Sequence, residues 1–331
     1  MTSFRNRMGW SLVLTSLALH LITVFCFARQ PDHFAAFTVL PIWIWGGGGL
    51  LLSSTAFYFL RAPLSLVMTA IWAVTLLVGS DEARVFANFS KSAPKPGPAA
   101  HHDGKPVLRV ITCNCADFLF GDPSKDVAVW DPDIVLLQDI APEQVRKIAD
   151  TIYGGHGDYR YHNSNGIVTR WKILREVRNP LQRDQQITIA QPDGSSIEVV
   201  NVHLATAATD LRLWHRSAWK DHRNNRALRQ KELALTLQIL EQTADIPNTP
   251  TFFGGDFNSP ASDVVHRQLD RDFEDAFSVA GTGWGDTFQR RLPILRIDHI
   301  YASRHFSPIR CSAVTTRHSD HRMVVADFLK R

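Results

Sequence analysis

The stretch Gly-Gly-Asp-Phe-Asn at residues 254–258 decides the fold, because it places a carboxylate and a carboxamide directly after a short apolar run. Residues 251–254 have the composition of a buried strand, and Gly, Asp and Asn are typical of the turn that ends one. The end of a strand is where a rigid scaffold presents polar side chains to a substrate. Taken alone, the stretch is also explained by an ordinary turn.

Further polar motifs stand in the same setting, at the end of apolar β-like runs or inside them. They are Thr-Cys-Asn-Cys at 112–115, Leu-Leu-Gln-Asp at 136–139, Asn-Val-His-Leu at 201–204, and the pair Ile-Asp-His at 297–299 and Ser-Asp-His at 319–321. A single one is as well explained by a buried core histidine or a polar turn. Together they supply carboxylates, carboxamides and imidazoles without a candidate Ser or Cys nucleophile. This chemistry indicates metal-assisted attack of water on a phosphate ester.

In their order along the chain, the five motifs resemble those of the endonuclease/exonuclease/phosphatase superfamily. That superfamily includes deoxyribonuclease I, abasic-site endonucleases, neutral sphingomyelinases and inositol-polyphosphate 5-phosphatases. The resemblance covers about residues 106–331 and identifies them as the catalytic domain of a bacterial, membrane-anchored member. It implies a four-layer α/β/β/α sandwich with two mixed sheets. It also implies a magnesium cofactor, with manganese as the alternative, and a phosphoester substrate: a lipid headgroup, a nucleic acid or a small molecule.

The resemblance assigns the metal site position by position. Asp139 is the expected principal ligand, because it ends an apolar strand where an unpaired carboxylate would be costly. Asn114 and Asp320 are expected beside it. The family usually has Glu where this chain has Asp139, so the metal must lie closer to the strand or be held through water. No His-Glu-x-x-His or paired Cys motif supports a zinc hydrolase instead.

Proton transfer is expected from His321, which we predict to be a catalytic base oriented by Asp298. His203 and Asn258 are expected to donate to the phosphoryl group. Asp256 is expected to orient the attacking water or to accept its proton. Whether Asp256 or the His321–Asp298 pair takes the proton is left open by the sequence.

A basic segment with interleaved aromatics covers residues 211–231. Such a segment binds nucleic-acid phosphates or anionic lipid headgroups, or it is a solvated helix face. Within it, Arg226 and Arg229 are the candidate substrate-binding residues. The formal net charge of the chain, +4, is too small to decide among these interpretations.

The first 80 residues differ in character. Apolar stretches at 9–28, 34–60 and 63–79 are each long enough to cross a hydrocarbon core of about 30 Å. We therefore predict a membrane anchor of three transmembrane helices at 1–80, with two spans as the alternative. A cleaved signal peptide is the competing explanation of the first stretch alone. Residues 81–105 form a predicted Pro-rich linker.

Basic residues at the ends of these stretches predict the orientation. Arg5, Arg7 and Arg61 favour the cytoplasmic side, although Arg29 opposes this bias. Three crossings of the bacterial cell membrane then place the catalytic domain outside the cytoplasm.

Strand-like runs alternate with a few helical patterns after residue 106, which by itself predicts an α/β fold. The strands are expected at 107–115, 134–138, 166–169, 187–190, 197–204, 251–254, 295–302 and 323–328. Helices are expected at 141–152 and 225–243.

We therefore expect a membrane-anchored, metal-dependent phosphoesterase, and we infer no obligate protein partner. One alternative is an extracytoplasmic nuclease that uses the basic segment as its groove. The other is a weakly active phosphate-ligand binding module, motivated by Asp139. The joint presence of the remaining polar motifs argues against this last alternative.

Overall fold

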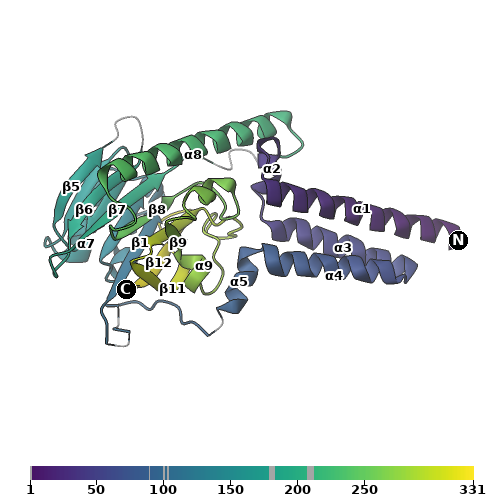
Figure 1. Ribbon diagram of the computed structural model, residues 1–331, viewed down its shortest axis with the longest axis horizontal. Coiled ribbons are helices and arrows are strands. Elements are labelled where there is room, and N and C mark those ends of the chain that lie inside the picture. Colours follow the sequence, from purple (N-terminus) through teal and green to yellow (C-terminus); the bar gives the residue numbers. More distant parts are fainter. Residues whose placement is uncertain (1, 89, 100, 103, 179–182, 207–211) are drawn as a thin grey trace. The chain divides into compact units, whose positions relative to one another are not determined.

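The computed structural model describes residues 2–88, 90–99, 101–102, 104–178, 183–206 and 212–331 (Figure 1). The chain divides into two compact units. Unit 1 comprises Met1–Ala87 with Thr209–Arg223, and unit 2 comprises Asn88–Ala208 with Asn224–Arg331.

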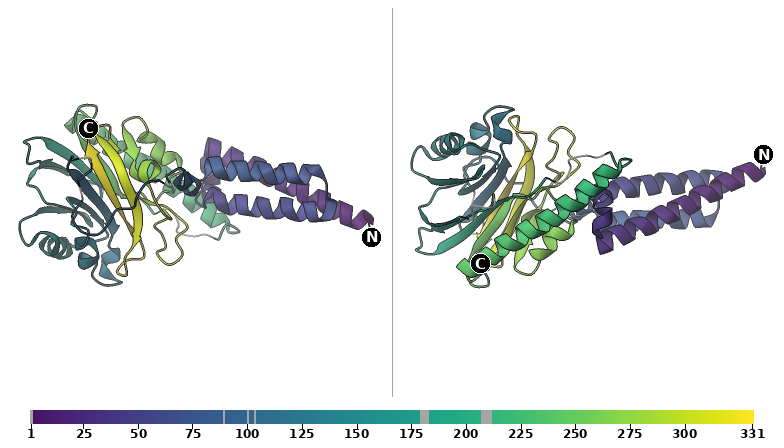
Figure 2. Two further views of the ribbon diagram at one scale, coloured as in Figure 1. Left: turned by 90° about the horizontal axis from the view of Figure 1, so that it is seen from below. Right: turned by 90° about the horizontal axis from the view of Figure 1, so that it is seen from above.

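Unit 2 contains two six-stranded mixed sheets, packed face to face (Figure 2). The first has the order β11(Phe306–Thr315), β12(Arg322–Lys330), β1(Val107–Asn114), β2(Ile134–Gln138), β4(Asn165–Thr169), β3(Asp158–His162). The second has the order β5(Ile173–Arg178), β6(Gln185–Ala190), β7(Ser196–His203), β8(Thr251–Asp256), β10(Asp298–Ser303), β9(Phe273–Asp275). In each sheet one central pair is parallel, β1 with β2 and β7 with β8, and the other pairs are antiparallel.

Helices cover the outer face of each sheet. On the first, α7 (Pro142–Tyr153) packs on β3 and β4, with α6 (Ser124–Ala128) beside it, and buries Val145 and Ile148 in a cluster that includes residues of β1 and β2. On the second, the part of α8 (Arg216–Thr243) that belongs to unit 2 buries Leu233 and Leu240 against β7 and β8. The smaller helix α9 (Ala276–Ala280) packs on β10 and β11. The two mixed sheets and their helices confirm the predicted α/β fold.

The strands that carry the polar motifs lie at the centre of the sheets, where every residue of β1, β2 and β8 is buried. Gly255 shows how tightly they fit: its φ is +133°, and a Cβ there would lie 2.1 Å from the carbonyl oxygen of Val202. Only glycine tolerates this conformation and this close approach. The glycine therefore allows β8 to present Asp256 beside the end of β7.

The predicted strands correspond to β1, β2, β4, β6, β7, β8, β10 and β12, with ends that match or are shifted by at most three residues. The prediction missed β3, β5, β9 and β11. Most residues of β3 and β5 are partly or fully exposed, so neither sequence shows a buried apolar run. The predicted helix at 225–243 was too short, because α8 begins at Arg216. Short 3-10 helices occupy Ala116–Phe118 and Val264–Gln268.

Unit 1 contains the apolar helices α1 (Thr2–Arg29), α3 (Ile42–Leu60) and α4 (Pro63–Gly79), joined by a 3-10 helix at Asp32–Phe34 and by α2 (Ala35–Thr38). The lengths of these helices in the structure do not support the prediction of three transmembrane helices. Among the described residues, only Phe4–Arg29 is long and apolar enough to cross a membrane by itself. The second predicted span is broken near Pro41 by a bend of 71°, and α4 has only 17 residues. By these criteria, α1 is a candidate membrane span or a signal sequence.

The predicted linker contains one helix, α5 (Asp81–Ala87), and then an extended segment. The guanidinium of Arg109 donates to the carbonyl oxygens of Lys95 (3.0 Å) and Gly97 (2.6 Å) and forms a buried ion pair with Asp327. The extended segment is therefore attached to unit 2. The division into an anchor at 1–80, a linker at 81–105 and a catalytic domain at 106–331 stays a prediction.

Candidate active site

The sheet topology brings the polar motifs together at one edge of the sandwich. Because β1 and β2 are parallel, as are β7 and β8, the carboxyl ends of each pair lie at the same edge of their sheet. The strand β10 runs antiparallel to β8, so its first residue lies at that edge too. The side chains delivered by these ends are Asn114 (β1), Asp139 (after β2), His203 (β7), Asp256 (β8) and Asp298 (β10).

These ends surround a polar cavity of about 170 Å³. One water needs roughly 10–15 Å³ of such volume, so the cavity has room for a phosphoryl group with an ion and waters. It is lined by Asn114, Asp139, His203, Thr206, Asp256, Asn258, Phe288, Ile297 and His321. The structure thus gathers six predicted site residues in one place, with Asp298 directly behind them.

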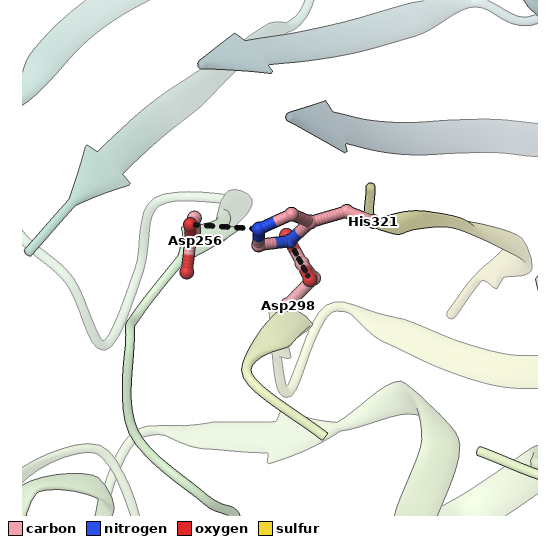
Figure 3. A group of neighbouring side chains, drawn as sticks. All are labelled: Asp256, Asp298 and His321. Atoms are coloured by element: carbon pink, nitrogen blue, oxygen red, sulfur yellow. Dashed lines mark hydrogen bonds and ion pairs between the residues drawn. The ribbon is translucent and has the colours of Figure 1, made fainter. Parts of the chain in front are cut away.

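Asp256, Asp298 and His321 form a compact buried group (Figure 3). The Nδ1 atom of His321 lies 2.8 Å from Oδ2 of Asp298, and its Nε2 lies 4.0 Å from Oδ2 of Asp256. The three side chains are 1–6% exposed. His321 therefore presents Nε2 to the cavity, while Asp298 fixes the orientation of its ring.

The charges of this group perturb its protonation. Burial opposes the charged form of His321, but the adjacent Asp298 carboxylate outweighs burial and raises the pKa of the imidazole to about 10. Burial, and then the charge of Asp298, raise the pKa of the Asp256 carboxyl. At neutral pH His321 is therefore an imidazolium, and Asp256 is a more basic carboxylate than an exposed aspartate.

Asn114 connects the carboxylates of Asp256 and Asp139. Its Nδ2 lies 3.0 Å from Oδ2 of Asp256 and 3.3 Å from Oδ2 of Asp139, while its Oδ1 accepts a hydrogen bond from the amide of Ala116. The imidazole of His203 lies between the same carboxylates, 3.5 Å from Asp139 and 3.8 Å from Asp256. The Asp139 side chain is 33% exposed, so its carboxylate remains accessible from the cavity.

Asn258 holds the turn that follows β8. Its φ is +48°, a conformation that Asn adopts more readily than most residues. Its backbone amide donates to Oδ1 of Asp256 (2.8 Å), and its side-chain amide donates to the carbonyl oxygen of Leu204 (3.0 Å). One of the two side-chain N–H protons is used in this bond, which leaves the second for a ligand in the cavity.

A buried histidine pair that sequence reasoning missed supports this turn. The Nε2 atoms of His266 and His299 lie 3.1 and 3.2 Å from the carbonyl oxygen of Ser259. A carbonyl only accepts, so both rings carry their proton on Nε2. The Nδ1 atoms then accept from the Tyr301 hydroxyl (2.8 Å) and the Arg296 guanidinium (3.1 Å), respectively. His299 follows Asp298 in a recognised motif, but no pattern in the sequence pointed to His266.

Another polar contact joins the two sheets just below the cavity. Gln138 donates from Nε2 to Oδ1 of Asn201 (2.6 Å), and Asn201 donates to the carbonyl oxygens of Leu137 and Gly166. Both side chains are fully buried. These two motif residues therefore fix the distance between the sheets, and with it the separation of Asp139 from His203.

Three predicted site residues lie elsewhere among the described residues. Asp320 is half-buried beside His321 but does not line the cavity. Its carbonyl oxygen accepts a hydrogen bond from the backbone amide of Arg290. Arg226 is fully buried in an ion pair with Asp263 (3.0 Å). Arg229 is 2% exposed and donates to the carbonyl oxygens of Ala205 and Thr206; burial lowers its pKa to about 10. Neither arginine reaches the cavity, since both stabilise the chain that follows β7 and β8.

The sequence matches the Endonuclease/Exonuclease/phosphatase family over residues 116–321. None of the curated protein sequences shows a significant match. Among solved structures, an endonuclease/exonuclease/phosphatase family protein from Bacteroides thetaiotaomicron is 15% identical, with a TM-score of 0.55 over 69% of this chain and 99% of that one.

Two further structures share the fold. A mannosyl-6-phosphatase from Bacteroides thetaiotaomicron is 16% identical, with a TM-score of 0.53 over 67% of this chain and 99% of that one. TDP2 from D. rerio, solved with a single-strand DNA product, is 16% identical, with a TM-score of 0.51 over 67% and 98%. At these identities the similarity establishes the fold, whereas the sequence match spans more than half of the chain. The chain therefore belongs to the endonuclease/exonuclease/phosphatase family.

Proposed function

We propose that this protein is a divalent-metal-dependent phosphoesterase in which water attacks a phosphodiester or phosphomonoester held in the cavity. The observation that carries the proposal is the convergence of Asp139, Asp256, His203 and the Asp298–His321 pair on one polar cavity. Acceptor-only carboxylates and a proton-bearing imidazole are the groups that this reaction needs.

The donor set fits a hard divalent cation on the Asp139 side of the cavity. Magnesium is held in proteins by one or two carboxylates, with waters and substrate phosphate completing its shell. Asp139 offers a partly exposed carboxylate, and Asn114 places the carboxylate of Asp256 beside it. When bound there, the cation would supply charge stabilisation for the phosphoryl oxygens and lower the pKa of a bound water.

The compact group of Asp256, Asp298 and His321 also satisfies the spacing of a metal site, with its ligand atoms within 4.8 Å of one another. We assign it to proton transfer instead. The Nδ1 of His321 is occupied by Asp298, and a pKa of about 10 leaves Nε2 protonated at neutral pH. An imidazolium has no lone pair for a metal.

In this proposal the imidazolium of His321 donates from Nε2 to a phosphoryl oxygen or to the leaving group. Asp256 accepts the proton of the attacking water, because a carboxylate with a raised pKa is the better base. His203 and Asn258, which lie beside Asp256, orient the phosphoryl group. The sequence left the choice between Asp256 and His321 as base open, and the position of the protons supports Asp256.

The two alternative functions have less support. A weakly active binding module does not need a buried Asp–His pair beside two further carboxylates. A nuclease groove along the basic segment has less support, because Arg226 and Arg229, the two arginines expected to bind the substrate, are buried. The purified full-length chain, assayed with magnesium or manganese against bis-p-nitrophenyl phosphate, plasmid DNA and phospholipids, tests the proposal. Hydrolysis of none of them would refute it.

We further propose that unit 1 is embedded in a lipid bilayer. Its helices bury hydrogen-bonded polar side chains beside a small apolar cluster and expose many large apolar side chains, as helices in a membrane do. Trp72 donates from Nε1 to the Ser16 hydroxyl (3.0 Å), and Thr69 donates to Ser53 (3.0 Å). A Cβ on Gly49 would lie 1.9 Å from the Trp72 ring, so α3 and α4 approach closely. Six large apolar side chains of these helices are 58–73% exposed: Leu14, Leu21, Leu51, Val74, Leu77 and Val78.

Membrane extraction and protease access test this second proposal. The chain should stay in the membrane at alkaline pH, with an intact N-terminus, because removal of α1 would take away Ser16, the hydrogen-bond partner of the buried Trp72. Protease added to intact spheroplasts should cut at the exposed residues 90–93 and release unit 2, if unit 2 lies outside the cytoplasm. Solubility at alkaline pH would refute the embedding, and protection until lysis would refute the orientation.

A further inference from the structure

We propose that two loops beside the cavity form an apolar rim that binds the hydrocarbon part of the substrate, so that the enzyme acts on amphiphilic phosphoesters. The rim consists of Leu119, Phe120, Trp284, Arg290 and Leu292. This inference rests on the proposed phosphoesterase function and names the substrate class of the same site.

The apolar side chains of the rim are unusually accessible for their size. Leu119 is 81% exposed and Leu292 is 77% exposed, while Phe120 and Trp284 are 46% and 45% exposed. Single exposed apolar side chains are common on protein surfaces, but several that lie together mark a binding surface. The question is therefore whether these four lie together.

Contacts join the two loops that carry them. Phe288 pairs with Leu295 across a hairpin-like turn, so Arg290 and Leu292 lie at its tip. The Arg290 guanidinium lies over the Phe120 ring, 5.3 Å from its centroid, and this joins the tip to the loop after β1. Trp284 donates from Nε1 to the carbonyl oxygen of Pro293 (2.9 Å), next to Leu292.

The rim is continuous with the catalytic cavity. The Phe288 ring lines the cavity, with its centroid 5.0 Å from that of the His321 ring. On the other loop, the amide of Ala116 donates to Oδ1 of Asn114 (2.9 Å), three residues before Leu119. A chain attached to a phosphate in the cavity can therefore run past Phe288 onto the rim without leaving the surface of unit 2.

The composition of the rim favours hydrocarbon over nucleobases. Bases bind to single-strand sites by stacking on aromatic rings. The most exposed residues of the rim are aliphatic leucines, which have no ring to stack on, and the Phe120 ring is partly covered by Arg290. Leucine and aromatic side chains bind alkyl chains by the hydrophobic effect. The guanidinium of Arg290 adds positive charge where an anionic headgroup would enter.

A pair of chromogenic diesters isolates the contribution of the chain. Methyl p-nitrophenyl phosphate and octyl p-nitrophenyl phosphate share the reaction and the leaving group and differ only in alkyl length. We would measure kcat/KM of both with the full-length chain in amphipol and magnesium, below the aggregation concentration of the octyl ester. We expect the octyl ester to be favoured at least about tenfold, because burial of roughly two methylenes suffices for that gain.

Variants then locate the effect. Leu119→Ser with Leu292→Ser should remove most of the preference for the octyl ester and leave turnover of the methyl ester unchanged. Leu174→Ser is the matched control, since Leu174 is 57% exposed on β5, outside the rim. It should keep the preference.

The outcomes separate the two proposals. No turnover of either ester would overturn the phosphoesterase function itself. Equal kcat/KM for the two esters, or a preference that survives in the double variant, would overturn the rim while the function stands. Competitive inhibition of methyl ester turnover by a single-stranded oligonucleotide, relieved by Trp284→Ala, would show that the rim binds bases and would also overturn it.

Discussion

Replacing Asp298 by Asn should strongly reduce turnover without unfolding the chain. The Asp298 carboxylate lies 2.8 Å from Nδ1 of His321, and both side chains are almost completely buried. Without this charge, burial disfavours the imidazolium and the ring loses its orienting partner. Loss of a positioned proton-transfer group typically costs about 10²- to 10⁴-fold in rate. That range corresponds to about 2.7 to 5.4 kcal/mol of transition-state stabilisation.

A double-mutant cycle on kcat/KM for bis-p-nitrophenyl phosphate tests whether the two residues act as a unit. Asp298→Asn and His321→Ala should each fall within this range, and the double variant should be little worse than either. Asp126 and His318 provide a matched control, because they form a 2.9 Å Asp–His pair that does not line the cavity. Asp126→Asn should leave turnover within about twofold. Multiplicative losses in the double variant, or a loss below tenfold in a folded His321→Ala, would refute the assignment.

The pH dependence gives a second readout of the same pair. The folded pKa of His321, about 10, lies above its ordinary value of 6.5, so the pair stabilises the fold fully below pH 6.5. This contribution is lost as the pH rises toward 10. If the imidazolium is the catalytic form, the rate should also fall only near pH 10, and Asp298→Asn should move that fall to lower pH. A rate in the wild type that rises through this range would identify His321 as a base instead.

Three further predictions follow from other contacts. Asp139→Asn should raise the magnesium concentration for half-maximal turnover, whereas Asp139→Glu should retain activity; loss of turnover with Glu in a folded chain would show that this carboxylate is not the ligand. Arg109→Met should lower the free energy of unfolding by about 3–5 kcal/mol, because it removes one of the two arginines that form ion pairs with the buried Asp327 and leaves Arg310; a change below 1 kcal/mol in thermal or denaturant unfolding would contradict this. His299→Leu should lower kcat more than it raises KM, and His299→Gln should recover part of the loss; equal effects of Leu and Gln would exclude a role for the N–H bond to Ser259.

The central strands could be predicted from the sequence because their burial is visible in a short run of neighbouring residues. A strand that is buried on both faces must be apolar, so polar residues at its end are conspicuous. This is why Asn114, Asp139, His203 and Asp256 were found before their proximity was known. Edge strands such as β3 and β5 are partly exposed and mixed in polarity, so no such contrast marks them.

The remaining features depend on contacts between distant residues. The sequence of α8 does not show which arginines are buried, because Arg226 is placed by Asp263 and Arg229 by the turn after β7. Nor does it show the rim, which depends on Phe120 meeting Arg290 across 170 residues of chain. Apolar length alone likewise predicted three spans without the break near Pro41.

The measurement that tests the account most directly is the metal dependence of phosphoester hydrolysis. The full-length chain would be titrated with magnesium, and separately with manganese, against p-nitrophenyl phosphate and bis-p-nitrophenyl phosphate, with Asp256→Asn measured in parallel. We predict saturable, metal-dependent hydrolysis of at least one ester that disappears in excess chelator and in Asp256→Asn. Hydrolysis that continues undiminished in chelator, or that is as fast in Asp256→Asn as in the wild type, would contradict the account.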